Sequence, residues 1–267
     1  PVCPVPFVAW PALGLPGWVG PLDVVLLIGR RGPESLAVAH EAVRRGSRVV
    51  VICPPDSPLA LQADSRSTTL LPVSTGDPLA AAVVGLVALH RLGLGPYTST
   101  DAIAAALDTV AEACSARTDV SVNPAKAMAL DLADATPLVW GGSVLAARAS
   151  RRIAEALRQA SGRVGLSADA SDLVGLVQQV APRDPFEDPF EESGGERRPG
   201  LVLVDDGLDD AAAVESRLRL ERNAEAAEIR VTRLTHREDS MMERYATVLL
   251  TGLFGAAYLQ IALGRTA

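Results

Sequence analysis

The sequence has few aromatic residues and almost no cysteine, and both scarcities limit what the protein can be. Aromatic residues make up 4% of the 267 positions while hydrophobic residues make up 48%, so the apolar mass is mostly Ala, Val and Leu. This composition is enough for one large domain or two medium ones and suits an α/β protein. Cys3, Cys53 and Cys114 are odd in number and far apart, which predicts neither a disulfide framework nor a CxxC site. A reducing cytoplasm is the simplest location.

Positive charge and several familiar motifs are also lacking. The net charge is −7 and the isoelectric point about 5.1, which argues against a nucleic-acid partner. The chain contains no GxSxG, GxGxxG or Walker A motif. His40, His90 and His236 are scattered, and none stands at a metal-ligand spacing. We therefore expect no metal and no cofactor.

One long uncharged segment and an irregular opening stand out. Tyr245–Gly264 is long enough to span a bilayer, but it contains polar Thr247, Thr251 and Gln260. A helix buried in a core or a subunit interface has the same pattern, and we expect that arrangement and no membrane partner. The opening stretch, PVCPVPFVAWPALGLPGWVG, fits neither a helix nor a strand. We expect it to continue a segment that began earlier, so that the first lobe is incomplete at its N-terminus.

Apolar runs alternate with helical patterns along the chain. Asp23–Ile28 and Arg48–Cys53 are continuous apolar runs, typical of buried parallel strands, on either side of a helix at Pro33–Arg45. The alternation predicts an α/β fold of two lobes, each a parallel sheet between helices, at residues 1–93 and 137–267, with a helical connection at 94–136. An acidic, Pro-rich surface loop is expected at 182–200. Further strands are expected at Thr68–Val73, Pro137–Trp140, Leu201–Val204 and Ile229–Leu234, and further helices at Asp77–Leu92, Asp101–Ala116, Ser143–Ala160, Ala168–Val180, Ala211–Glu228 and Met241–Leu263.

Two glycine-containing turns are the candidate ligand sites, because parallel sheets bind ligands at the carboxyl ends of their strands. Gly29-Arg30-Arg31-Gly32 follows the first strand, and Gly141-Gly142-Ser143 follows the first strand of the second lobe. Glycine lets backbone N–H groups approach an anion, and the following helix adds partial positive charge. Arg30 and Arg31 would add direct contacts to a phosphate. Asp205 and Asp206 also end a strand and fit either the site-facing edge or a helix cap.

Several stretches together resemble the sugar isomerase (SIS) superfamily, and most closely the bifunctional phosphoglucose/phosphomannose isomerases. They are LPGWVGPLDVVLLIGRRGPESLAVAHEAVRRGSRVVVIC, NPAKAMALDLADATPLVWGGSVLAARASRRIAEAL and MMERYATVLLTGLFGAAYLQIALG. The resemblance spans most of residues 13–178 and 201–264. It implies two flavodoxin-like SIS lobes, a sugar-phosphate ligand and a homodimer that buries the C-terminal helix.

The chain departs from that family at its ligand and catalytic positions. The family's S-x-S-G-x-T phosphate loop aligns with Leu27, Gly29 and Gly32, so all three hydroxyls are missing. The family's Pro-Arg pair is similar to Pro78-Leu79, which lacks the arginine.

The resemblance places the catalytic glutamate at Gln159, and Gln cannot accept the proton that isomerisation moves between C1 and C2. The family's ring-opening histidine has no counterpart, because no His occurs between His90 and His236.

Three hypotheses follow. The first is a degenerate relative that binds a sugar phosphate or another small anion with little or no turnover, in a regulatory or structural role. The second is an active aldose–ketose isomerase with a rewired site, in which Glu155, one helical turn from Gln159, is the base and His40 or His236 opens the ring. The third is a membrane-anchored protein of unrelated function, held by Tyr245–Gly264. We favour the first.

Overall fold

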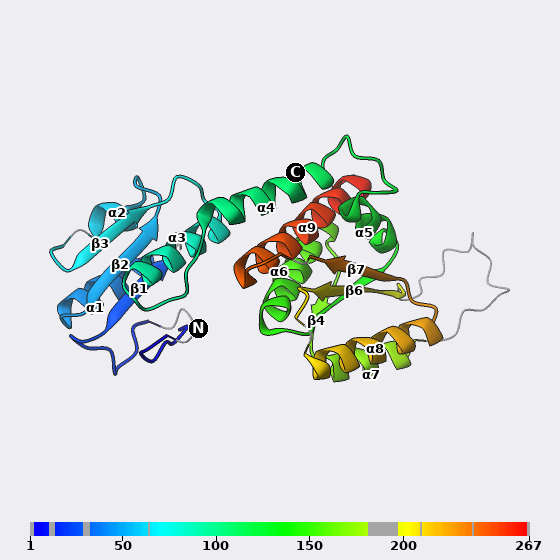
Figure 1. Cartoon of the computed structure of the whole chain (residues 1–267), viewed down its shortest axis with the longest axis horizontal. Coiled ribbons are helices and arrows are strands. Elements are labelled where there is room, and N and C mark those ends of the chain that lie inside the picture. The colour runs from blue at the N-terminus through cyan, green and yellow to red at the C-terminus, as the bar shows by residue number, and fades with distance from the viewer. Residues whose placement is uncertain are drawn as a thin grey trace. The chain divides into compact units, whose positions relative to one another are not determined.

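A computed structural model describes residues 3–10, 14–28, 33–63, 65–180, 197–208, 210–236 and 238–265. The chain divides into two compact units, residues 1–100 and 101–267. Figure 1 labels their helices and most of their strands. The turn at 29–32 and most of the acidic loop expected at 182–200 lie outside the described residues.

The first unit is a three-layer arrangement around a parallel sheet of three strands in the order β1-β2-β3. Helices α1 and α2 pack on one face of this sheet through the cluster around Ala42 and Val51. Helix α3 packs on the other face through the cluster around Ile52 and Ala81. The strands are β1 (Val24–Ile28), β2 (Arg48–Cys53) and β3 (Thr68–Pro72), and the helices are α1 (Pro33–Arg44), α2 (Pro58–Gln62) and α3 (Pro78–Arg91).

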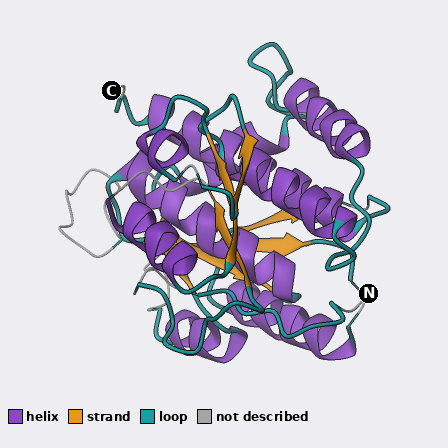
Figure 2. Ribbon diagram, turned by 90° about the vertical axis from the view of Figure 1, so that its left-hand side faces the viewer, coloured by secondary structure: helices purple, strands orange, loops and turns teal. Residues whose placement is uncertain are grey.

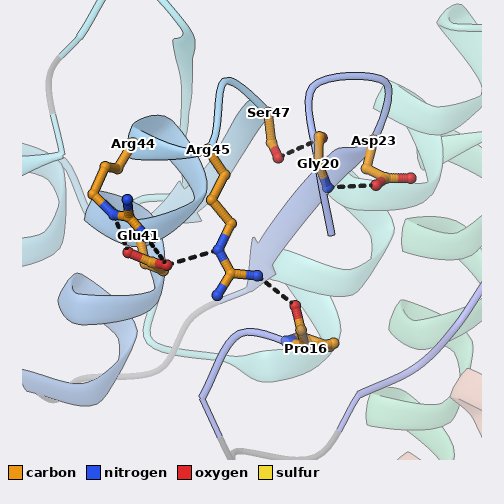
Figure 3. A network of polar contacts seen from close by, with 7 residues as sticks. All are labelled: Pro16, Gly20, Asp23, Glu41, Arg44, Arg45 and Ser47. Carbon is orange, nitrogen blue, oxygen red and sulfur yellow. Dashed lines mark hydrogen bonds and ion pairs between the residues drawn. The ribbon is translucent and has the colours of Figure 1, made fainter. Parts of the chain in front are cut away.

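The stretch that precedes β1 is irregular, as the sequence predicts, and polar contacts hold it to the end of α1 (Figure 3). Arg45 Nη1 donates to the Pro16 carbonyl at 2.8 Å, and Ser47 Oγ donates to the Gly20 carbonyl at 2.7 Å. Glu41 accepts from Arg45 at 2.7 Å. Hydrogen bonds from Arg44 and Arg45 lower the pKa of Glu41 to about 2, so this carboxylate stays charged.

The second unit is a larger three-layer sandwich whose sheet has four parallel strands in the order β5-β4-β6-β7. One face packs on α5, α6 and α9 through side chains such as Val139, Val202 and Leu234. The other face packs on α7 and α8 through Leu138 and Leu203. Its elements are α4 (Thr100–Ala113), α5 (Pro124–Leu132), β4 (Thr136–Gly141), α6 (Val144–Ser161), β5 (Leu166–Ser167), α7 (Ala170–Gln178), β6 (Pro199–Asp205), α8 (Ala211–Ala226), β7 (Val231–Thr235) and α9 (Met241–Ala262).

The predicted fold class is confirmed: both units are parallel sheets flanked by helices, and Figure 2 draws the strands in orange between the purple helices. Alternating side chains of β2, β4 and β6 enter the two clusters of their unit, which is why these strands read as continuous apolar runs. The segment 94–136 forms α4 and α5. Both helices belong to the second unit, apart from the first residue of α4, Thr100, which belongs to the first unit.

Helix α9 is, within the described residues, the one helix long and apolar enough to cross a membrane. Half of its most apolar stretch is buried inside the second unit. It packs against α6 so closely that a Cβ on Gly252 would lie 2.4 Å from Ile153 Cγ1. Core helices of soluble proteins share this length and composition.

Candidate functional site

The turn between β4 and α6 contains Gly141, Gly142 and Ser143, and packing accounts for both glycines. A Cβ on Gly141 would lie 2.3 Å from the carbonyl carbon of Ala146, so glycine lets the first turn of α6 approach the strand. A Cβ on Gly142 would lie 2.7 Å from the Ala213 Cβ and 2.8 Å from the Trp140 ring. The space beside Gly142 is therefore filled by the protein's own side chains.

Ser143 is the N-cap of α6 and also contacts a buried carboxylate. Its Oγ accepts a hydrogen bond from the backbone N–H of Ala146 at 2.9 Å and donates one to Oδ2 of Asp206. Asp206 is only 3% exposed, and its Oδ1 receives the N–H of Leu208 at 3.4 Å. A carboxylate at a helix N-terminus is stabilised by the helix dipole. The anion at the start of α6 is thus a side chain of the same lobe.

The neighbouring Asp205 is also fully engaged. Its Oδ2 lies 2.6 Å from Arg217 Nη1, and its Oδ1 receives the N–H of Gly207 at 2.9 Å. The sequence left open whether Asp205 and Asp206 cap the next helix, but the N-cap of α8 is Asp210. Asp206 instead accepts from Ser143, and both aspartates line a hollow beside the turn that contains Ser143.

A small hollow lies among these residues at the carboxyl edge of the sheet. Its walls include Trp140, Gly142, Asp205, Asp206 and Arg217. It holds about 20 Å³, which is room for one water molecule and far less than a hexose phosphate needs. Two carboxylates and one guanidinium line it, so its charge does not favour a second anion.

Glu155 and Gln159 lie on α6, away from that hollow's lining. Glu155 Oε2 lies 3.1 Å from Arg152 Nη1, and its side chain is 44% exposed. Gln159 is exposed. Ile153 faces α9, and a residue two positions later lies about 200° further around the helix, so Glu155 points away from α9.

The structure brings no histidine into hydrogen-bond contact with Glu155 among the described residues. Nε2 of His236 pairs with Oγ1 of Thr251 on α9 at 3.1 Å. Burial lowers the pKa of His236, and the nearby Glu238 opposes that shift. His40, in the first unit, contacts the Gln62 carbonyl at 3.1 Å.

Two site features escape sequence reasoning. The Ser143–Asp206 bond joins residues 63 positions apart, and Arg217 reaches the site from the middle of α8. The adjacent Asp205-Asp206 pair at a strand end was the available signal for the first of these contacts. Residues 3–180 and 197–265, apart from the few positions not described, contain no group of three or more His, Cys, Asp or Glu side chains that could hold a metal ion.

Comparison with known families and structures identifies the fold and the family. Residues 121–266 match the family model for the bacterial phospho-glucose isomerase C-terminal SIS domain. The chain belongs to this SIS family. The match covers α5 through α9 and every strand of the second unit, so the predicted SIS resemblance is confirmed.

Solved structures similar to this SIS protein extend the likeness over nearly the whole chain. A glucose-6-phosphate isomerase like protein from Thermus thermophilus is 16% identical, with 93% of this chain and 84% of that one covered and a TM-score of 0.58. Tagatose-6-phosphate ketose/aldose isomerase from Escherichia coli is 11% identical, with 92% and 70% covered and a TM-score of 0.62. No curated protein matches. At these identities the likeness to solved structures establishes the fold alone.

Proposed function

We propose that this SIS-domain, phosphosugar isomerase-like protein binds a sugar phosphate and catalyses little or no isomerisation, in a regulatory or structural role. The observation that supports this most directly is the state of Glu155. It is the carboxylate nearest the Gln159 position along α6, yet it is half-exposed, paired with Arg152 and without a histidine partner in the described residues. Proton transfer through an enediol needs a positioned base, which typically contributes about 10²–10⁴-fold in rate.

The phosphate would bind at the turn after β1 rather than at the turn after β4. Asp206 already occupies the start of α6, and the adjoining hollow holds about 20 Å³. The sequence after β1 carries Arg30 and Arg31 between two glycines, and guanidinium groups bind phosphate with charge-assisted hydrogen bonds. An Arg30→Gln, Arg31→Gln double variant should weaken glucose 6-phosphate binding, measured by calorimetry, whereas Arg117→Gln should not.

A second candidate function is an active aldose–ketose isomerase that uses Glu155 as its base. It is favoured by the position of Glu155 beside Arg152, on a face of α6 that also carries Arg148, because these side chains follow helical spacing. A base and two cations on one face are the groups that an enediol mechanism would use.

Proton exchange at C2 of glucose 6-phosphate or mannose 6-phosphate in heavy water separates the two functions. NMR detects this exchange even where net isomerisation is slow. The binding protein should broaden the sugar-phosphate lines and exchange no C2 proton. The rewired isomerase would be established, and our proposal overturned, if C2 exchange occurs, Glu155→Gln abolishes it and Glu228→Gln leaves it intact. Glu228 is an exposed control.

We further propose a cytoplasmic homodimer with no nucleic-acid or membrane partner. The exposed side of α9 supports the homodimer, since Leu253 is 40% exposed and Ile261 is 61% exposed. A second subunit would remove these side chains from water. Light scattering should give twice the chain mass, and a Leu253→Glu, Ile261→Glu variant should give the mass of one chain.

A further inference from the structure

The first unit contains an apolar cavity of about 360 Å³ on the α3 face of its sheet. Its floor is Val50 of β2, and one wall is formed by Thr69 and Leu71 of β3. The register pairs Val50 with Thr69 and Ile52 with Leu71, so these side chains share one face of the sheet. The opposite wall is one face of α3: Val84, Val87, Ala88 and Arg91 follow helical spacing.

The cavity exists because α3 covers β1 and β2 but leaves the β3 flank of the sheet open. A Cβ on Gly85 would lie 3.1 Å from Cδ1 of Ile52 and 3.5 Å from Cδ1 of Ile28, so α3 is held closely over the first two strands. Arg91, the last residue of α3, lines the cavity together with Thr69, the second residue of β3, so Arg91 lies toward the amino edge of the sheet. The turn after β1 follows the carboxyl end, so this cavity is separate from the proposed phosphate site.

The chemistry of the walls selects a particular kind of ligand. The lining residues are aliphatic except for Thr69, Thr100 and Arg91. Arg91 is exposed, and its guanidinium has no hydrogen bond or ion pair with the described part of the chain. A sugar phosphate would find too few partners for its hydroxyls here. Aliphatic walls together with the cationic Arg91 match an aliphatic chain that ends in one negative charge.

We propose that this cavity is a second ligand site, which binds a medium-chain aliphatic carboxylate with its tail between α3 and β3 and its carboxylate on Arg91. The volume lies at the lower end of the range found for small-molecule sites. This site is independent of sugar-phosphate binding and goes beyond the proposed function.

Octanoate and octanol are matched probes, because they share the tail and differ in charge. In methyl NMR of the full chain, added octanoate should shift the signals of Val50, Leu71, Val84 and Val87 until the site is saturated. Octanol should bind about tenfold more weakly. Arg91→Gln should weaken octanoate binding about tenfold and leave octanol binding unchanged, so that the preference for the carboxylate disappears. Arg117→Gln, on an exposed arginine of the second unit, should alter neither.

Ala88→Phe fills the cavity and should abolish binding of both probes. Its melting temperature shows whether the fold survives, and Arg91→Gln tests the proposal even where it does not. The proposal is overturned if octanoate does not saturate, if octanol binds equally well to the unaltered protein, or if the shifts lie outside the cavity. It is also overturned if light scattering shows that Ala88→Phe converts a dimer into monomers, because the cavity would then be a contact between copies.

Discussion

Removal of the Ser143 hydroxyl tests the structure of the β4–α6 turn. In Ser143→Ala, α6 loses its N-cap acceptor, which typically costs about 1 kcal/mol. Asp206, 3% exposed, loses its hydroxyl donor and keeps only the long contact from Leu208, and a hydrogen bond to a charged group is worth about 1.5–3 kcal/mol. We expect the free energy of unfolding to fall by about 2–4 kcal/mol.

The measurement needs a signal from the second unit alone, and the tryptophans provide it. Trp140 lies against the turn and is 6% exposed, whereas Trp10 and Trp18 belong to the first unit. In a Trp10→Phe, Trp18→Phe background, urea unfolding followed by fluorescence reports on the environment of Trp140. An unchanged slope with denaturant would show that the substitution alters stability and not the unfolded state.

A conservative variant and a double-mutant cycle separate the two roles of Ser143. Ser143→Thr keeps the hydroxyl and should lose less than about 1 kcal/mol, because Thr also serves as an N-cap. Asp206→Asn combined with Ser143→Ala should lose less than the sum of the single losses, with a coupling of about 1 kcal/mol or more. A Ser143→Ala loss below about 0.5 kcal/mol, or strictly additive effects, would refute the proposed role of the buried pair.

The remaining predictions concern α9. Burial lowers the pKa of His236, so as the pH falls the unfolded chain binds a proton more readily than the folded chain. The contribution of His236 to stability should therefore be complete above about pH 6.5 and decline as the pH falls below that value. His236→Gln should flatten this part of the pH profile of the urea midpoint. Gly252→Ala places a Cβ 2.4 Å from the β-branched Ile153 and should cost about 1–3 kcal/mol, partly recovered by Ile153→Ala, which calorimetric melting would measure. Gly255→Ala is the matched comparison, because its Cβ would lie 2.1 Å from the flexible end of Met128. It should therefore lower stability less than Gly252→Ala does, and an equal loss of stability would contradict this reasoning.

Local patterns predict the elements well where a segment is long and uniformly apolar. Helix α6 was expected at Ser143–Ala160 and occupies Val144–Ser161 with Ser143 as its cap, because the cap residue and the apolar stripe are both local signals. Strand β5 has only two residues, Leu166 and Ser167, and such a short pairing leaves no periodic signal in the sequence.

The candidate site was harder to predict because its contacts are not local. Gly141-Gly142-Ser143 does mark a strand-to-helix turn, as expected. Whether such a turn is open to a ligand depends on what packs beside it, and here that includes Asp206 and Ala213, more than 60 residues later in the chain. A turn sequence identifies a potential anion site, but distant residues decide whether the protein fills that site itself.

The two candidate turns therefore differ in the charged residues that the sequence and the described structure place beside them. After β4, the hydroxyl of Ser143, the N-cap of α6, donates to the buried Asp206 carboxylate, and a bound phosphate would have to displace Asp206 or place its charge beside it. Either event opposes binding, because two anions at one helix N-terminus repel each other and the buried Asp206 would lose its partners. After β1, the sequence offers two arginines and no acidic residue until Glu34. This asymmetry is why we propose the turn after β1, rather than the turn after β4, as the sugar-phosphate site.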